Sequence, residues 1–133
     1  MVDIGLTHIA LPVRSLAASI AFYGRYADMR VVHSREHVAW LSDETRPFVI
    51  VLLESAQAIA PLAAPAHLGV GLASRAEIER KAQMARAEGC LAAEPKDSGP
   101  PVGYWALLRD PDGHILELAH GQEVGLTIER ANA

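Results

Sequence analysis

The sequence has a single cysteine, no apolar run long enough to cross a bilayer and no cluster of basic residues. Cys90 alone cannot form an intrachain disulfide. The N-terminus enters a strand-like run within a few residues, without the basic and apolar regions of a signal peptide, so a reducing cytoplasm is the expected location. The twelve Lys and Arg residues are dispersed in a chain of net charge −4, unlike the basic stripe of a nucleic-acid-binding protein. We therefore expect the protein to bind neither nucleic acid nor a membrane. A small molecule is the expected partner.

The composition that remains is that of one globular domain. The chain has 133 residues, of which 50% are hydrophobic and 21% are charged. A chain of this length buries enough apolar surface to fold without disulfides or structural metals. We expect a single domain over residues 1–133.

An internal repeat is the most informative feature that is present. The segments His8-Ile-Ala-Leu-Pro-Val-Arg-Ser15 and His67-Leu-Gly-Val-Gly-Leu-Ala-Ser74 both run from a histidine through apolar residues to a serine. A stretch with helical spacing follows each serine, and β-rich sequence follows each helix. The same supersecondary unit therefore occurs twice, and each copy begins with a potential metal ligand.

The first copy is predicted to be a βαβββ unit over about residues 4–54. Residues 4–13 alternate as a strand, with Leu11 and Val13 on one face and His8 on the other. Ser15 is the expected N-cap of a helix. The predicted apolar stripe of this helix comprises Leu16, Ile20, Tyr23 and Ala27, and the predicted strands that follow span 29–34, 37–41 and 48–54.

After a linker at 55–64, the second βαβββ unit is predicted over about residues 65–120. Ser74 and Glu77 have the spacing of a capping box, and Gly89 suits the position that ends the helix. The predicted stripe comprises Ile78, Ala82 and Ala85, and the predicted strands span 90–94, 104–108 and 114–120. The sequence beyond Gly121 predicts no definite element. The fold class is α+β.

The histidine faces of the two opening strands carry small residues. Ala10 lies beside His8, and Gly69 and Gly71 follow His67 on the same face, which leaves room for something that is not protein. Glu117 lies in an otherwise apolar strand, where a carboxylate is costly to bury unless it is paired or bound to a metal.

These residues resemble the vicinal oxygen chelate superfamily, which includes glyoxalase I, bleomycin-resistance proteins and type I extradiol dioxygenases. The resemblance rests on the paired units, on His8-Ile-Ala-Leu-Pro-Val, on Phe22-Tyr23 and on Asp110-Pro111-Asp112-Gly113-His114-Ile115-Leu116-Glu117. It covers about residues 4–120 and implies a cup-shaped, partly open β-barrel flanked by helices. It also implies one divalent metal ion bound by His8, His67 and Glu117, and, as is common among family members, a homodimer.

The family's fourth ligand position falls at Val51 or its neighbour Ile50, neither of which binds metal. Glu54 lies further on, near the expected strand end, and is a weak substitute. Two imidazoles and one carboxylate with open coordination sites suit Fe(II) and are compatible with Mn(II) or Zn(II); a glyoxalase-like reaction adds Ni(II) to the candidates. A substrate with two adjacent oxygens could chelate at the open sites.

The reaction stays open between dioxygenase-like and glyoxalase-like chemistry. The missing fourth ligand weakens glyoxalase I proper, and Leu107 stands where extradiol dioxygenases have a tyrosine helper. Tyr104 and His120 are the candidate acid–base groups instead. Fosfomycin transferases line their site with cations, whereas the stretch at 96–101 offers only Lys96.

The alternative class is a metal-independent, antibiotic-binding protein of the bleomycin-resistance type. The retained His/His/Glu set argues against it, because a pure binder needs no convergent metal donors. Trp40, Tyr104 and Trp105 are interpreted as core aromatics, with Tyr104 or Trp105 as possible pocket walls.

Overall fold

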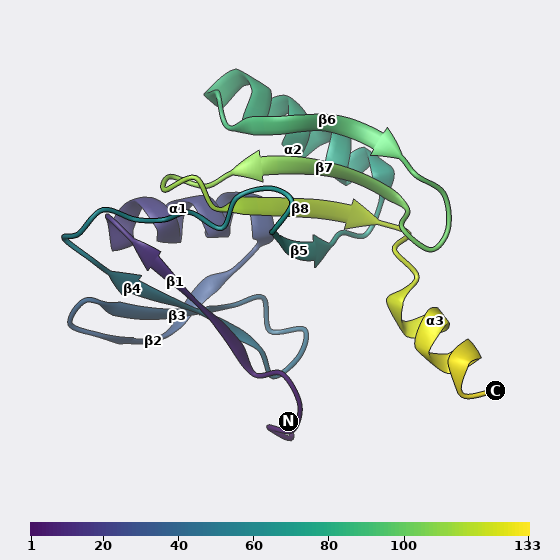
Figure 1. The fold of residues 1–133 in the computed structure, drawn as a ribbon, viewed down its shortest axis with the longest axis horizontal. Helices are drawn as coiled ribbons and strands as arrows, with labels where there is room; N and C mark the ends of the chain where they lie inside the picture. The colour runs from purple at the N-terminus through teal and green to yellow at the C-terminus, as the bar shows by residue number, and fades with distance from the viewer. The chain divides into compact units, whose positions relative to one another are not determined.

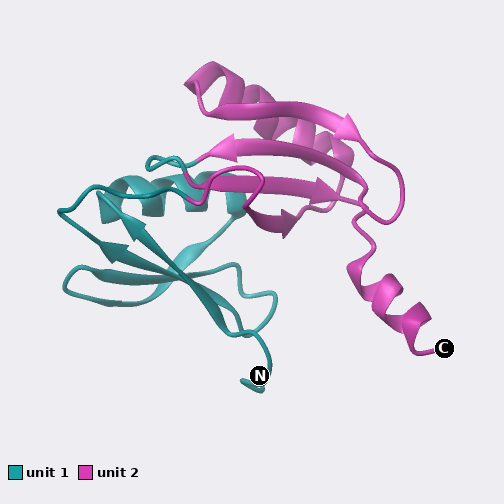
Figure 2. Ribbon diagram, in the orientation of Figure 1, with its two compact units in different colours: residues 1–61, 110–113 teal, residues 62–109, 114–133 magenta.

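The computed structural model describes residues 1–133 and has an α+β fold with two four-stranded mixed sheets (Figure 1). The chain forms two compact units, coloured separately in Figure 2. Unit 1 comprises Met1–Pro61 and Asp110–Gly113, and unit 2 comprises Leu62–Arg109 and His114–Ala133.

Unit 1 is a βαβββ unit, as the sequence predicts. Its strands lie in the order β1-β4-β3-β2, so that the first and last strands in the chain are neighbours and run parallel. The other two strand pairs are antiparallel. The elements are β1 (His8–Val13), α1 (Leu16–Ala27), β2 (Arg30–Arg35), β3 (Val38–Ser42) and β4 (Val49–Glu54).

Unit 2 repeats this topology with the strand order β5-β8-β7-β6, again with its first and last strands parallel. The predicted duplication of the βαβββ unit is confirmed, and neither sheet closes on itself. The elements are β5 (Leu68–Gly71), α2 (Arg75–Glu88), β6 (Leu91–Asp97), β7 (Tyr104–Arg109) and β8 (Ile115–His120).

The opening strand of unit 1 is shorter than predicted. It begins at His8, the register partner of Val49 on β4, and the Val49 amide donates to the carbonyl of the preceding residue, Thr7. Ile4 and Leu6 precede this pairing and remain 83% and 88% exposed. Alternation alone therefore does not make a strand of residues 4–6, because a strand also needs a neighbour for its backbone groups.

Both predicted helix starts are confirmed by side-chain caps. The Ser15 hydroxyl accepts a hydrogen bond from the Ala18 amide, and the Ser74 hydroxyl accepts one from the Glu77 amide. The predicted stripe of α1 is partly wrong, because Phe22 and Tyr26 are buried there instead of Leu16 and Ile20.

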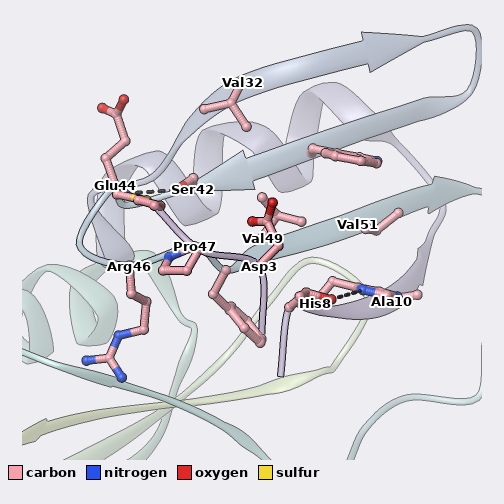
Figure 3. A pocket seen from close by; sticks show the side chains of 14 residues that line it. Asp3, His8, Ala10, Val32, Ser42, Glu44, Arg46, Pro47, Val49 and Val51 are labelled. Atoms are coloured by element: carbon pink, nitrogen blue, oxygen red, sulfur yellow. Dashed lines mark hydrogen bonds between the residues drawn. The ribbon is translucent and has the colours of Figure 1, made fainter. Parts of the chain in front are cut away.

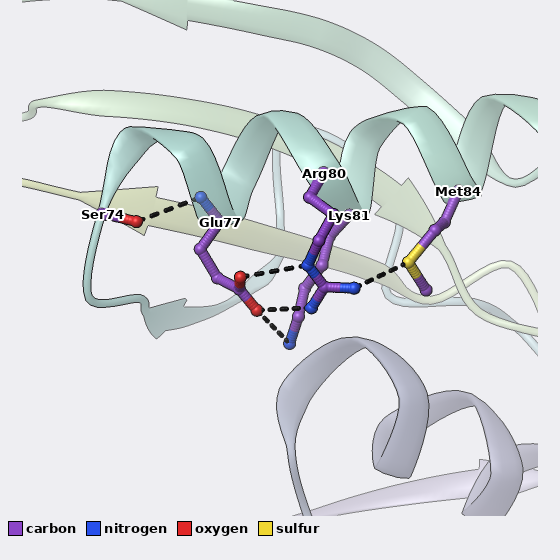
Figure 4. Close-up of polar contacts among 5 residues, drawn as sticks. All are labelled: Ser74, Glu77, Arg80, Lys81 and Met84. Carbon is purple, nitrogen blue, oxygen red and sulfur yellow. Dashed lines mark hydrogen bonds and ion pairs between the residues drawn. The ribbon is translucent and has the colours of Figure 1, made fainter.

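The capping box at the start of α2 is only half formed (Figure 4). The Glu77 carboxylate does not return to the serine backbone but pairs with the Arg80 guanidinium at 2.6 Å, with the Lys81 ammonium 4.0 Å away. The aliphatic stem of Lys81 lies within the buried side of α2, together with Ile78, Ala82 and Ala85. The helix ends at Gly89, in the left-handed conformation expected of that position.

Each sheet has one face against its own helix and an opposite face, which we call the open face. In unit 1, α1 packs against β2, β3 and β4, and the helix face carries Leu11, Val13, Leu41, Ile50 and Leu52. In unit 2, α2 packs against β6, β7 and β8, and its helix face carries Ala106, Leu108, Leu116 and Leu118. The residues predicted to bind metal alternate with these core residues.

The C-terminal segment forms a helix that the sequence did not predict, α3 (Val124–Ala131), which buries none of its residues. None of the helices has both the length and the apolar character needed to cross a membrane.

Candidate functional site

Unit 2 brings two of the three predicted ligands together. Glu117 on β8 is the register partner of Gly69 on β5, and His67 lies two residues before that glycine. The His67 Nε2 atom is 3.9 Å from the Glu117 Oε2 atom. The parallel pairing of β5 with β8 thus joins donors from opposite ends of the second repeat.

The His67 ring is held in the tautomer that a metal ligand needs. Its Nδ1 atom lies 2.9 Å from the carbonyl oxygen of Pro65. Because a carbonyl oxygen only accepts, Nδ1 carries the proton and the neutral ring has its lone pair on Nε2. A backbone carbonyl on the remote nitrogen is the usual way to orient a metal-bound imidazole. Nε2 is also the ring atom that lies 3.9 Å from the Glu117 carboxylate.

Glu117 is a buried carboxylate without a hydrogen-bond donor. Its side chain is 10% exposed, and its one polar contact is the 3.9 Å approach to His67. The residue opposite it on β7 is Leu107, which is apolar. A carboxylate in such surroundings needs a positive partner, since desolvation without compensation is unfavourable.

Gly69 leaves the space beside this carboxylate empty. A Cβ atom at Gly69 would lie 3.4 Å from Glu117 Oε2, at the near limit of ordinary van der Waals contact. The small residue predicted beside the donors is therefore in direct contact with the carboxylate, with no side chain between them.

The pair fits a divalent ion in donor type and nearly in spacing. Two donors on one ion at about 2.0–2.2 Å stand roughly 3 to 3.5 Å apart. The observed 3.9 Å is within reach of a small rotation of either side chain. Neither unit by itself gathers three His, Cys, Asp or Glu side chains into a metal-binding group.

The third predicted ligand, His8, lies on the open face of unit 1. Its Nδ1 atom is 3.0 Å from the Thr7 hydroxyl, and its side chain is exposed. In the sheet, His8 is opposite Val49 and Ala10 is opposite Val51. Because Ala10 and Gly69 each follow the repeat histidine by two residues, Val51 is the counterpart of Glu117. Unit 1 has a valine where unit 2 has a carboxylate.

Glu54 is not available to replace Val51. One of its carboxylate oxygens is 3.0 Å from His37 Nδ1, and the other accepts the Leu16 amide at the start of α1. The His37 contact and the Leu16 amide both favour the charged form and hold the pKa of Glu54 below its usual value. Both carboxylate oxygens of Glu54 therefore already have partners in unit 1.

The candidate acid–base groups lie on the other face of the unit 2 sheet. Tyr104 and His120 are register partners. The Tyr104 hydroxyl donates to Glu79 of α2, and its ring lies 4.0 Å from the Arg75 guanidinium. His120 Nδ1 is 2.9 Å from the Leu72 carbonyl oxygen. The structure does not bring either residue together with Glu117, which is on the open face.

A pocket of about 770 Å³ lies on the open face of unit 1 and includes His8 (Figure 3). Trp40, which the sequence analysis interpreted as core, is 42% exposed and lines it. The loop between β3 and β4 supplies Arg46 and Phe48. Sequence reasoning missed this loop because nothing in its composition distinguishes it from an ordinary turn.

Comparison with known proteins places the fold. The sequence model of one protein family, the Glyoxalase/Bleomycin resistance protein/Dioxygenase superfamily, matches residues 5–118 of this chain. The uncharacterised protein PA2024 of Pseudomonas aeruginosa is 39% identical over 128 residues, which cover 90% of this chain and 91% of that protein.

Two solved structures show the same fold at low sequence identity. Glyoxalase I of Leishmania major has a TM-score of 0.70 and 21% identity, covering 98% of this chain and 94% of its own. A mutant of the fosfomycin resistance protein FosX of Listeria monocytogenes, complexed with Mn(II) and 1S,2S-dihydroxypropylphosphonic acid, has a TM-score of 0.73 and 18% identity. That match covers 98% of this chain and 99% of the FosX chain.

Proposed function

Because the chain belongs to the Glyoxalase/Bleomycin resistance protein/Dioxygenase superfamily, we propose that it is a divalent-metal-dependent enzyme acting on a small molecule with two adjacent oxygens. The chemistry is dioxygenase-like or glyoxalase-like. The proposed ligands are His8, His67 and Glu117. One observation supports the proposal: the buried carboxylate of Glu117 has no hydrogen-bond donor and lies 3.9 Å from Nε2 of His67, the ring nitrogen that the Pro65 contact leaves unprotonated.

The chain's own residues have distinct parts in this proposal. The Pro65 carbonyl fixes the His67 tautomer, and Glu117 contributes the only negative charge of the set. Leu107 and Gly69 keep other polar groups away from that carboxylate. A bound divalent ion would supply Lewis acidity toward the two substrate oxygens. Tyr104 and His120 are not included, because they lie on the helix face of the sheet.

The donor set is compatible with Fe(II), Mn(II), Zn(II) or Ni(II). The FosX relative is complexed with Mn(II) and a compound that has two neighbouring hydroxyl groups. A protein of this fold can therefore bind both a divalent ion and a compound with adjacent oxygens. The two histidines and one glutamate of the present chain leave coordination sites for such a ligand.

The variant E117Q tests the ligand set. It removes the anionic donor but keeps the volume, so we expect wild-type protein to gain thermal stability with Mn(II) or Zn(II) and E117Q to lose that gain. E129Q, at an exposed position on α3, is the matched control and should behave as wild type. Titration calorimetry would measure the metal affinity of each protein. Equal metal binding by wild type and E117Q would refute the ligand assignment.

Activity then distinguishes the two chemistries. Protein loaded with Fe(II) would be tested on catechols with an oxygen electrode. Protein loaded with Zn(II), Ni(II) or Mn(II) would be tested on 2-oxoaldehydes mixed with thiols. Oxygen uptake assigns the dioxygenase-like branch, and isomerisation of the thiohemiacetal assigns the glyoxalase-like branch.

A metal-independent binding protein is the second candidate, favoured by the largely apolar pocket of unit 1. Such a protein would bind its ligand equally well after chelation. The absence of metal-dependent turnover in both screens, together with chelator-insensitive binding, would select this alternative.

A further inference from the structure

The two repeat histidines have different partners at the ring nitrogen Nδ1. His67 Nδ1 faces the carbonyl oxygen of Pro65, which can only accept a hydrogen bond. His8 Nδ1 instead lies 3.0 Å from the hydroxyl of Thr7, a contact drawn as a dashed line beside His8 in Figure 3. Because the histidines occupy equivalent places in the repeat, the two units orient the same ring by different means.

The position of Thr7 just before β1 makes its contact with His8 possible. Within a regular strand, adjacent side chains point to opposite faces and do not meet. The strand begins at His8, and the Thr7 carbonyl accepts the Val49 amide at 3.0 Å, which anchors the backbone where the pairing with β4 starts. Thr7 is half-buried, and its β-branched side chain has few rotamers available. The group that contacts the ring is thus itself restricted in position.

The second unit has no side chain equivalent to that of Thr7. The residue before His67 is Ala66, which lacks a hydroxyl, and the contact to Nδ1 comes from the backbone of Pro65. A backbone carbonyl is present whatever the side chain is. The contact in unit 1 therefore depends on residue type, and a single substitution can remove it.

A hydroxyl differs from a carbonyl because it can donate or accept a hydrogen bond. If the Thr7 hydroxyl donates, Nδ1 holds the lone pair and the neutral His8 ring has its proton on Nε2. If the hydroxyl accepts, Nδ1 carries the proton and Nε2 has the lone pair. Only the second arrangement makes Nε2 a metal ligand. The hydroxyl can meet it by turning its hydrogen away, with the heavy atoms in place.

We propose that Thr7 is a positioning residue of the metal site: its hydroxyl holds the His8 ring and accepts from Nδ1–H when Nε2 binds the ion. The inference rests on the proposed function, and it adds the residue that orients the ligand from unit 1. Hydrogen-bond partners of metal-bound imidazoles are typically worth about 10- to 100-fold in metal affinity.

The first experiment isolates the hydroxyl. T7V keeps the shape of threonine without the hydroxyl, T7S keeps the hydroxyl, and T127V makes the same exchange as T7V at an exposed position on α3. We expect T7V to bind Zn(II) about 10- to 100-fold more weakly than wild type, and T7S and T127V to stay within about threefold of it. Competition with a chromophoric chelator would measure the affinities. Thermal melts would confirm folding, and T7A repeats the test if T7V is poorly folded.

The second experiment needs no metal. Three-bond NMR couplings to Cγ of His8 report its χ1 angle in chelator-treated protein. We expect one rotamer in wild type and T7S, and averaging over rotamers in T7V, with His67 unchanged in all three. Averaged couplings for His8 in wild type, or a single rotamer retained in T7V, would overturn the inference.

The two measurements separate this inference from the proposed function. If wild type binds Zn(II) and T7V binds it equally well, or if T7V and T7S lose the same affinity, the role of the hydroxyl is refuted and the proposed function stands. If wild type binds neither Zn(II) nor Mn(II), the proposed function is refuted, and with it the part of Thr7 in metal binding. A His8 rotamer that is lost only in T7V would then leave the orientation of the ring by Thr7 standing.

Discussion

A single backbone carbonyl, that of Pro65, determines which ring nitrogen of His67 is available as a metal ligand. With Pro65 accepting from Nδ1, the imidazole presents Nε2 to the same space as the Glu117 carboxylate. The residue type made His67 a candidate, but the hydrogen bond specifies which nitrogen is available. Because Pro65 precedes the strand, this orientation is independent of the sheet register.

Gly103 shows how strongly one residue can constrain the fold of unit 2. Its φ is +85°, and a Cβ atom there would lie 2.7 Å from the carbonyl carbon of Gly121. We predict that G103A loses about 2 kcal/mol or more of its free energy of unfolding, from backbone strain and overlap together. Urea denaturation would measure the loss.

The matched control is G71A. Gly71 lies in β5, and a Cβ atom there would have no neighbour within 4 Å. This substitution should change the free energy of unfolding by only a few tenths of a kcal/mol, or stabilise slightly. Equal destabilisation by G103A and G71A would contradict the prediction.

At the scale of elements, the two sheets have the same topology but unequal donors. In both units the first strand is parallel to the last, so the repeat histidine has an equivalent neighbour on each sheet. That neighbour is Glu117 in unit 2 and Val51 in unit 1. The duplication thus supplies two histidines but only one carboxylate.

This register gives a prediction for V51E. A carboxylate at Val51 restores the donor that the repeat lacks, and we expect the affinity for Zn(II) to rise by about an order of magnitude. L53E is the control, because Leu53 is on the same strand and face but two residues further from His8 along the sheet. Competition with a chromophoric chelator would measure both affinities.

If V51E and L53E bind Zn(II) with wild-type affinity while E117Q binds none, the metal lies apart from the open face of unit 1. His8 would then be excluded as a ligand. The result would leave His67 and Glu117 as the protein's contribution.

At the scale of the whole molecule, each of the two units is built from two separate stretches of the chain. Residues Asp110–Gly113 belong to unit 1, although the flanking strands β7 and β8 belong to unit 2. The Tyr23 hydroxyl donates to Asp110 at 2.8 Å, and the Arg14 amide donates to Asp112. The turn predicted from Asp110-Pro111-Asp112-Gly113 is present, and its carboxylates also anchor it to the first half of the chain.

This contact predicts a loss of stability at alkaline pH. Burial, and then the charge and hydrogen bond of Asp110, raise the pKa of Tyr23 far above its usual value. The folded state therefore keeps the phenol neutral, whereas the unfolded state ionises near pH ~10. The contribution of Tyr23 is complete below about pH 10 and declines as the pH rises above it.

The variant Y23F tests this dependence. At neutral pH it should cost about 1–3 kcal/mol, because buried Asp110 loses a donor. Above about pH 10 the difference between wild type and Y23F should shrink. Y104F removes a hydroxyl that bonds to Glu79 at an exposed position and should cost less. Urea unfolding at several pH values would measure both, and a constant Y23F difference at all pH values would contradict the prediction.

The sequence by itself determined the duplicated unit, the helix caps and the candidate ligands. Ser15, Ser74 and Gly89 act on backbone groups within a few residues, so local sequence is sufficient to predict them. The small residues beside the histidines were likewise visible, because strand alternation assigns faces without knowledge of neighbouring strands.

Tertiary structure alone decided which groups meet. The start of β1 depends on Val49, the role of Asp110 depends on Tyr23, and the pairing of His67 with Glu117 depends on the β5–β8 register. The placement of Tyr104 against α2 and the exposure of Trp40 have the same origin. These contacts join residues far apart in the chain, and such contacts leave no periodic signal in a single sequence.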